Sequence, residues 1–575
     1  MYIDVVPNRK SRPAILLRAS RRVGSRTVKA TLANLTDWPP DVVAGLRRLL
    51  ERRRRGEPIG EEAFAIERSI PHGHVQAALA MAKKIGLDAL IASKPSRQRD
   101  LVLAMAIERL IDPGSKLATT RLWHTTTLAR ELGVEEATVD DLYAAMDWLS
   151  ARQERIERKL AQRHLSEGAL VLYDVTSSYY EGRHCPLARF GHSRDGKKGR
   201  PIIVYGLLSD GEGRPVAVET YPGDTGDPTT VPDAVERLRR DFGLERVVLV
   251  GDRGMLTQTQ IDRLKEYPQL GWISALRSGA IRALARQGAV QMTLFDKQNL
   301  AEIASPDFPG ERLVVCYNPQ LGEERARKRR ELIEATRRDL DKIAAEARRR
   351  TKTPLSNEQI ALKVGRVIHR RKMAKHFVLR IDAHRLDYEI NEAAVAEEQA
   401  LDGIYVIRTS ESAEHLSAPQ AVRAYKSLAQ VERAFRTMKT VELEVRPIFH
   451  RTERRVPTHI FLCMLAYYLE WHLRKAWKPL LFDDEDLDED RRTRDPVAPA
   501  RPSDGARRKK AARQTEDGLP VHSFRSLLAE LGTLCKNRCR IQTGKTETRI
   551  DLATEPTDLQ ARAFHLIEVC PVHGI

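Results

Sequence analysis

The chain has 575 residues, too many for one hydrophobic core, so its length predicts two to four domains. Lys and Arg (97) outnumber Asp and Glu (79), and the net charge of +18 favours a polyanionic partner, because neutralised phosphates release counterions. The six scattered cysteines exclude a disulfide scaffold and suit a reducing cytoplasm, and no apolar stretch is long enough for a membrane role. A basic protein without a nucleic-acid partner is the alternative that charge leaves open.

The first part of the chain is expected to hold two units. Residues 1–70 predict an N-terminal β and basic segment, with a basic helix from Val42 to Arg55. Residues 71–165 have apolar residues spaced by three and four, which predicts a helical domain. Its surface Arg and Lys make it a candidate DNA-end-binding domain, although most small helical bundles bind no DNA.

From residue 166 the apolar pattern changes to short strands. Three expected antiparallel strands are followed by helix, strand, helix and strand, which is the order of an α/β RNase H-like core. A further strand near residue 404 returns to this core after a long gap. We therefore expect the catalytic core in two parts, 166–278 and 402–477, with the helical N-terminal domain before it.

The remaining segments are expected to lie outside the core. Residues 279–401 predict a mixed α/β insertion domain that leaves the core, and its stretch 325–350 holds eleven Arg or Lys against five Asp or Glu. That excess suits a polyanion, a solvated charged face being the alternative. Residues 483–518 have almost no large apolar side chains and predict a disordered charged linker, followed by a small C-terminal segment, 519–575.

Carboxylates on different elements form the candidate site. Two predicted strands each end at an aspartate, Asp174 and Asp252, and a predicted helix carries Tyr425, Glu432 and Lys439 seven residues apart, along one face. Singly, each acid has an ordinary explanation as a turn or salt-bridge residue. Together they are hard oxygen donors for Mg²⁺ or Mn²⁺, and two such ions about 3.5–4 Å apart promote phosphodiester chemistry.

These residues stand in stretches that point to one family. Tyr173-Asp-Val-Thr, Gly251-Asp-Arg-Gly and Tyr425-x6-Glu-x6-Lys resemble the DDE transposases of bacterial insertion sequences. The branch of this family that the chain resembles has a Tyr-Arg-Glu-Lys helix and a large insertion before the last acidic residue. The resemblance covers about residues 165–475. It implies an RNase H-like core, two Mg²⁺ or Mn²⁺ ions, and DNA cleavage and strand transfer at terminal inverted repeats. It further implies target DNA as a partner, a synaptic homo-oligomer and a nucleoid-associated bacterial protein.

The resemblance also assigns roles to residues. It implies a catalytic, metal-binding triad and a set of DNA contacts. The triad is Asp174, Asp252 and Glu432, and the expected DNA-binding residues are Tyr425, Arg436, Lys439 and Arg253. The branch has an arginine three residues after the tyrosine, where this chain has Leu428. Arg436, one turn beyond Glu432, is the candidate to supply the missing cation.

Two other functions stay open at this stage. An RNase H-like DNA nuclease without strand transfer would use the same metal site. A catalytically dead DNA-binding regulator would not need it, and the presence of Asp174, Asp252 and Glu432 speaks against that reading.

Overall fold

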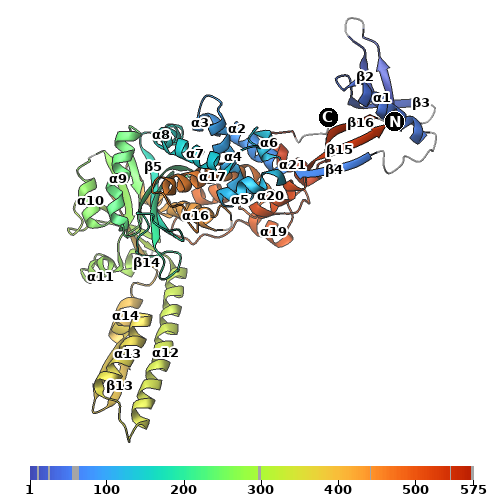
Figure 1. Ribbon diagram of the computed structural model, residues 1–575. Helices are drawn as coiled ribbons and strands as arrows, with labels where there is room; N and C mark the ends of the chain where they lie inside the picture. The colour runs from blue at the N-terminus through green and yellow to red at the C-terminus, as the bar shows by residue number, and fades with distance from the viewer. Residues whose placement is uncertain are drawn as a thin grey trace.

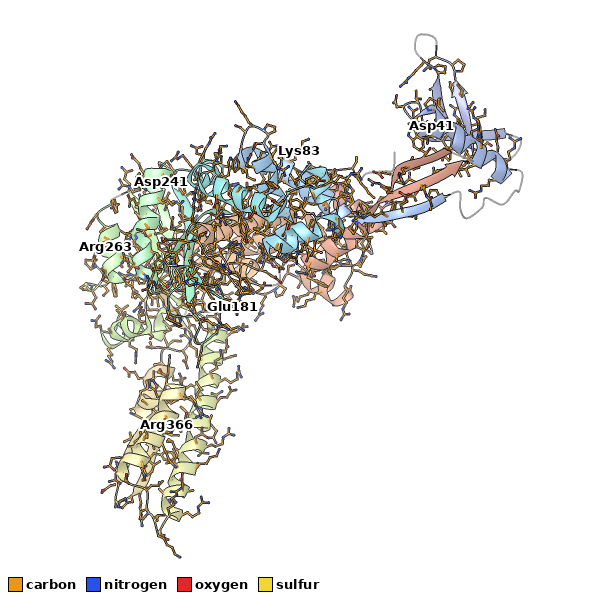
Figure 2. The ribbon with its side chains drawn as sticks, in the orientation of Figure 1. Asp41, Lys83, Glu181, Asp241, Arg263 and Arg366 are labelled. Atoms are coloured by element: carbon orange, nitrogen blue, oxygen red, sulfur yellow. The ribbon has the colours of Figure 1, made fainter. Side chains whose placement is uncertain are left out.

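A computed structural model describes residues 1–8, 12–23, 26–54, 64–267, 269–295, 299–440, 442–543 and 546–570. Figure 1 shows a central body with two arms that point in different directions. One arm contains the helices α12 and α13, and the other contains strands from both ends of the chain. Side chains cover all these parts (Figure 2).

The central body is built on one eight-stranded mixed sheet. Strand β8 pairs in parallel with β5 and with β9, and every other pair of neighbours is antiparallel. Helices α9 (Val231–Glu236) and α10 (Gln258–Leu264) connect β7 to β8 and β8 to β9. In spatial order the strands are β10 (Leu300–Ile303), β11 (Arg312–Tyr317), β14 (Ile404–Thr409), β9 (Leu270–Ala275), β8 (Val247–Val250), β5 (Ala169–Tyr179), β6 (Ile202–Asp210) and β7 (Pro215–Pro222).

Two strands of this sheet correct a prediction. Residues 279–401 were predicted to leave the core, yet β10 and β11 extend the sheet beyond β14. Strand β11 carries a run of apolar residues that is buried, and it pairs with β14 along its whole length. On one face of β11, Leu313 and Val315 share a small apolar cluster with helix α11 (Ser278–Arg286). The buried surface therefore keeps this part of the chain on the core.

The first arm begins only at α12 (Pro319–Arg349), a helix of 31 residues. It packs against α13 (Asn357–Arg371) and the hairpin β12 (Phe377–Asp382) and β13 (Arg385–Ile390). Helix α14 (Glu392–Gln399) leads back to the sheet. The arm has its own apolar cluster, so it is a helical projection with a separate small core.

Helix α17 (Arg455–Trp477) runs through the middle of the body. It is apolar on all sides and buried over most of its length, as expected for a helix with partners all round. It contacts α2 (Gly73–Lys84), α4 (Arg97–Ile111) and α7 (Val139–Ser150), and also β7. The helices predicted in 71–165 therefore form, but they share one core with the sheet. The others there are α3 (Leu87–Ile91), α5 (Lys116–Leu122), α6 (Leu128–Glu131) and α8 (Gln153–His164).

The second arm joins the two ends of the chain. Strand β15 pairs with β4, and with its hairpin partner β16 it completes a three-stranded sheet. The predicted basic helix is α1, although its predicted last residue, Arg55, lies outside the described residues. The elements of this arm are β1 (Tyr2–Val6), β2 (Ala14–Val23), β3 (Arg26–Asn34), α1 (Pro40–Arg54), β4 (Phe64–Pro71), β15 (Cys535–Thr543) and β16 (Thr546–Ala553). Helices α20 (Phe524–Gly532) and α21 (Asp558–Leu566) flank the β15–β16 hairpin in the sequence and pack on the core of the body, against α2 and α17.

The segment 483–518, predicted to be disordered, is folded onto the body. It forms α18 (Leu487–Thr493) and α19 (Asp504–Ala512), and Val497 between them is fully buried. The Lys426 ammonium donates to the Val497 carbonyl oxygen at 3.2 Å. The composition of this segment could not form a core of its own. Polar contacts to the rest of the protein hold it in place instead. Among all described helices, none is long and apolar enough to cross a membrane.

Candidate active site

Asp174 lies on β5, and Asp252 follows the end of the neighbouring parallel strand β8. Strands β5 and β8 pair with Leu172 opposite Val250, and the two aspartates follow two residues later on each chain segment. Neighbouring strands are about 4.8 Å apart. The Asp252 charge also helps to raise the pKa of Asp174, which places the two carboxylates within electrostatic reach.

Asp174 lies inside its strand, whereas the sequence predicted it at the strand end. Strand β5 continues to Tyr179, because Val175, Thr176 and the residues after them favour extended backbone and pair with β6. The partly buried Asp174 carboxylate accepts a hydrogen bond from the Val175 amide at 2.8 Å. Burial raises the pKa of Asp174 to about 7, and the charges of Asp252 and Glu432 add to this rise.

Asp252 is exposed and stands just past the end of β8. Its Oδ1 accepts hydrogen bonds from the amides of Gly254 (2.9 Å) and Met255 (2.7 Å). This is the turn-forming role that an aspartate after a strand ordinarily has. Here the turn also fixes the carboxylate beside Asp174, while in the described part of the chain Oδ2 has no hydrogen-bond partner.

Glu432 comes from a pair of helices that the sequence predicted as one. Helix α15 (Ala418–Lys426) ends at a turn residue, Ser427, and α16 (Leu428–Lys439) starts directly after it. The Ser427 hydroxyl donates to the Ala424 carbonyl oxygen at 2.6 Å, a contact that tends to bend helices. Tyr425 is therefore on α15, and Glu432 and Lys439 are on α16.

The buried face of α16 orients Glu432 toward the aspartates. Val431 and Phe435 are buried, and the Phe435 ring meets the Tyr205 ring of β6 edge-on at 5.8 Å between centroids. Helix α16 lies against β5, the strand of Asp174. Glu432 itself is exposed, and its charge raises the pKa of Asp174. The structure thus brings the three predicted acids into one electrostatic group.

Tyr425 belongs to the same group. Burial raises its pKa to about 12, with the charges of Asp252 and Glu432 as further causes and the Arg253 guanidinium opposing them. Its phenol is therefore neutral and can donate a hydrogen bond. Arg253 is exposed next to Asp252, and its backbone carbonyl oxygen accepts from the Arg277 guanidinium at 3.2 Å.

The other two predicted DNA contacts differ in their surroundings. Arg436 is exposed, and no carboxylate of the described residues lies within 4 Å of it. Lys439 is instead held in a buried ion pair with Asp195, and burial lowers its pKa. Leu428, at the position where the resembled branch has arginine, is buried.

Two residues near the acids were missed by the sequence analysis. Arg194 donates to the Val175 carbonyl oxygen and pairs with Asp227, and its charge lowers the pKa of Asp174. Its neighbour Asp195 accepts from the Tyr179 amide at 3.1 Å. The sequence feature that could have revealed these two residues is the connection between β5 and β6. It is far longer than a hairpin loop and rich in Arg and Lys.

The donor chemistry of the site suits divalent metal ions. The carboxylates of Asp174, Asp252 and Glu432 supply the hard oxygens that Mg²⁺ takes. Burial raises the pKa of Asp174, and the charges of Asp252 and Glu432, which a cation would neutralise, raise it further. Within the described ranges, however, no three His, Cys, Asp or Glu side chains already converge as a complete metal-binding group. The three acids thus supply suitable ligand atoms for the ions, but they do not form a complete coordination site in the described structure.

Comparison with known protein families identifies the catalytic type of domain that this chain contains. The family model described as a transposase DDE domain matches residues 169–469, which is more than half of the chain and includes all three acids. No curated protein matches. Eight chains of solved structures match.

Two of these structures are transposases. A piggyBac transposase synaptic complex with hairpin DNA, determined by cryo-electron microscopy, is 11% identical, with 80% of this chain and 76% of that chain covered and a TM-score of 0.32. A Mos1 transposase paired-end complex with the left transposon end is 14% identical, with 33% and 62% covered and a TM-score of 0.14. Both TM-scores are too low to support an inference.

Proposed function

Because this chain belongs to the DDE transposase family, we propose that it is an insertion-sequence transposase that cleaves DNA at the element ends and transfers the cut strands. One observation carries the proposal: Asp174 on β5 and Asp252 just past the end of the neighbouring parallel strand β8 lie within reach of the Glu432 charge. Carboxylates so placed repel one another in the absence of cations, an arrangement that serves metal-dependent phosphoryl transfer.

We assign the catalytic core to the RNase H-like class. The support is the sheet, in which antiparallel β7, β6 and β5 continue into parallel β8 and β9. In this assignment β14 and the strands beyond it are additions, and the arm from α12 to α14 is the insertion domain. Its charged helices are proposed as a surface for DNA.

In the proposed mechanism the three acids would hold two Mg²⁺ or Mn²⁺ ions, which would supply activation of the attacking oxygen and stabilisation of the leaving oxygen of the phosphodiester. Asp174 is fixed by the Val175 amide, and Asp252 by the turn at Gly254, so both carboxylates are preorganised. Glu432, on α16, would be the third ligand.

The cations and the phenol around the acids hold the DNA. Arg253 and Arg436 are exposed and can contact phosphates on either side of the cut bond. Tyr425 keeps its proton and donates to a phosphate oxygen. Lys439 is proposed to act with them, although in the free protein it is paired with Asp195.

A cleavage assay tests the function. A supercoiled plasmid carrying the DNA that flanks the gene is incubated with Mn²⁺ and either wild-type protein or Glu432→Gln, with the exposed Glu414→Gln as the control. We expect cuts at the element ends with wild type and Glu414→Gln, and none with Glu432→Gln. A second reaction with pre-cleaved ends measures strand transfer.

The outcomes separate the alternatives. Cuts followed by joining to target DNA support a transposase that acts on terminal inverted repeats in a synaptic homo-oligomer. Cuts without joining would identify a nuclease that only hydrolyses. Binding of the ends without any cut would identify a catalytically dead DNA-binding regulator.

A further inference from the structure

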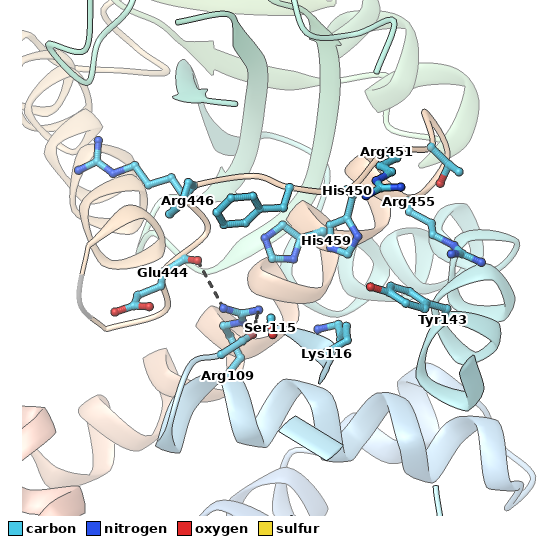
Figure 3. Close-up of a pocket in the computed structure, with 14 residues that line it drawn as sticks. Arg109, Ser115, Lys116, Tyr143, Glu444, Arg446, His450, Arg451, Arg455 and His459 are labelled. Atoms are coloured by element: carbon cyan, nitrogen blue, oxygen red, sulfur yellow. Dashed lines mark hydrogen bonds between the residues drawn. The ribbon is translucent and has the colours of Figure 1, made fainter. Parts of the chain in front are cut away.

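A cavity of about 590 Å³ lies between the helices α4, α5 and α7 and the chain that leads from α16 into α17. Figure 3 shows its lining, which converges from elements far apart in the sequence. Five of the lining residues are Arg or Lys, and one is acidic. These six are Arg109, Lys116, Arg446, Arg451, Arg455 and Glu444.

Two of the basic residues are buried without a direct ion pair among the described residues, and the carboxylate of Glu108 on α4 is the negative charge that acts on both. Lys116 is 5% exposed and Arg109 is 6% exposed, and within the described chain no carboxylate lies within 4 Å of either. Arg109 donates only to backbone carbonyl oxygens, those of Gly114 (3.0 Å), Glu444 (3.4 Å) and Leu443 (3.5 Å). A buried cation without a direct ion pair destabilises a fold. Two such side chains at a cavity wall therefore indicate that the cavity can accept an anion.

The other cations do not relieve this charge. Arg455 is paired with Asp147 at 2.9 Å, and Arg446 is paired with Asp195. Arg451 is exposed at the rim, and none of the described carboxylates lies within 4 Å of it.

Two histidines on the cavity wall remain neutral. Burial lowers the pKa of His450 to about 3, with the Lys116 and Arg109 charges as further causes. Burial likewise lowers the pKa of His459, whose Nε2 donates to the Val445 carbonyl oxygen at 3.0 Å. Both rings therefore supply hydrogen-bonding nitrogens and aromatic surface without any charge of their own. The cavity is positive, polar and partly aromatic.

We propose that this cavity binds a phosphate group. Lysine and arginine are the side chains that recognise phosphate, and the volume falls in the range of small-molecule sites. Tyr143 and Phe449 also line the cavity, and their rings suit the sugar or base of a nucleotide that carries the phosphate. The phosphate chemistry follows from the cavity alone, whereas its source as a phosphate of the DNA strand rests on the proposed function.

The phosphate in this cavity is not the one that is cut. The Tyr180 hydroxyl donates to the His450 carbonyl oxygen at 3.1 Å, so the cavity adjoins the far end of β5. Asp174 precedes Tyr180 by six residues, about 20 Å along a strand. At 3.4 Å per nucleotide, that is roughly six nucleotides of one DNA strand. The cavity would therefore hold the transposon DNA at a distance from the cut.

The test uses Lys116→Met, which removes the buried charge with little change in volume. Lys83→Met, at an exposed position on α2, is the matched control. Melting temperatures are measured with and without inorganic phosphate, and binding of an element-end duplex is measured by fluorescence anisotropy at several salt concentrations. Arg451→Gln, at the exposed rim, is a second variant that leaves the core intact.

We expect Lys116→Met to raise the melting temperature of the unliganded protein and to lose the stabilisation by phosphate. Its DNA affinity should fall about tenfold, with a salt dependence reduced by about one ion. Arg451→Gln should weaken both phosphate and DNA binding, and Lys83→Met should change neither.

The effects of the variants on phosphate stabilisation and on DNA binding, taken together, identify the source of the phosphate. Loss of phosphate stabilisation with weaker DNA binding identifies the DNA backbone, and loss of phosphate stabilisation alone identifies free phosphate or a nucleotide. The proposal is overturned if phosphate does not stabilise the wild type and Lys116→Met binds DNA normally, or if the variant keeps the full phosphate effect. Phosphate stabilisation in a protein that cuts no DNA would leave this site standing and reject the proposed function.

Discussion

The ammonium group of Lys439 lies 3.0 Å from the carboxylate of Asp195, and both side chains are almost fully buried. Arg446 pairs with the same carboxylate. Asp195 also accepts from the Tyr179 amide, so one carboxylate connects the end of α16, the end of β5 and the long connection between β5 and β6. The position of α16, and with it Glu432, therefore depends on a residue outside the proposed triad.

Replacement of Asp195 tests this dependence. In Asp195→Asn the buried Lys439 and the partly exposed Arg446 lose their counter-charge, and we expect the free energy of unfolding to fall by about 3 kcal/mol. The double variant Asp195→Asn with Lys439→Met should recover part of that loss, because one of the unpaired cations is gone. Urea unfolding followed by tryptophan fluorescence measures both. Additive effects of the two substitutions would show that the pair does not couple.

Neutral replacements of the three acids test the catalytic assignment. Asp174→Asn, Asp252→Asn and Glu432→Gln keep the shape of each side chain but remove a charged metal ligand. We expect each to lower the cleavage rate by at least about 10³-fold, because several kcal/mol of transition-state stabilisation are lost. Binding of an element-end duplex should survive in all three. A variant that still cuts at a near-normal rate would remove its residue from the triad.

The role of Arg436 is tested against a neighbour on the same helix. Arg433 is also exposed, but it pairs with Asp483 at 3.0 Å, whereas Arg436 has no carboxylate that close among the described residues. We expect Arg436→Ala to lower DNA affinity about tenfold and to reduce the salt dependence by about one ion. Arg433→Ala should change either quantity much less. Equal effects would mean that α16 presents only a general positive surface.

The charge of Lys116 predicts a specific pH dependence of stability. Burial lowers the pKa of Lys116 to about 7, from an ordinary value of 10.5. Between these values the unfolded chain binds more protons than the folded one, so this residue makes the folded protein more stable as pH rises. The stability advantage of Lys116→Met should be largest near pH 6. It should shrink by up to about 1.4 kcal/mol per pH unit between pH 7 and pH 10.

Thermal unfolding of both proteins across this range measures the effect. Other groups face Lys116 and titrate or carry charge in both proteins, so the difference between the two curves is the quantity to compare. They are Glu108 and Arg109 on α4, His450 before α17, and His459 and Cys463 on α17. A constant difference from pH 6 to pH 10 would contradict the lowered pKa.

Features set by local pattern could be predicted from the sequence. The apolar runs before Asp174 and Asp252 predicted β5 and β8, because a run of buried apolar residues is a local signal. The family was predicted from short motifs around the same residues and is confirmed by the domain match. The roles of the three acids remain predictions, although the structure places them together.

Features set by distant contacts could not be predicted. Asp195 pairs with Lys439 across 244 positions, and no local pattern reveals such a partner. Strand β11 was assigned to a separate domain because its pairing partner, β14, follows only after the whole arm. The helices α18 and α19 have no apolar face of their own, and contacts such as that of Lys426 with the Val497 carbonyl hold the segment. In each case the deciding interaction comes from elsewhere in the chain.

The pairing of β4 with β15 has a consequence for synthesis of the protein. Strand β4 precedes the helices and the catalytic sheet, yet its hydrogen-bond partner is made only after both of them. A growing chain on the ribosome must therefore carry β4 without this partner until β15 has been synthesised. The second arm is therefore completed only after the whole body has been made, and translation products that stop before β15 would lack two of the three strands of its β16-β15-β4 sheet.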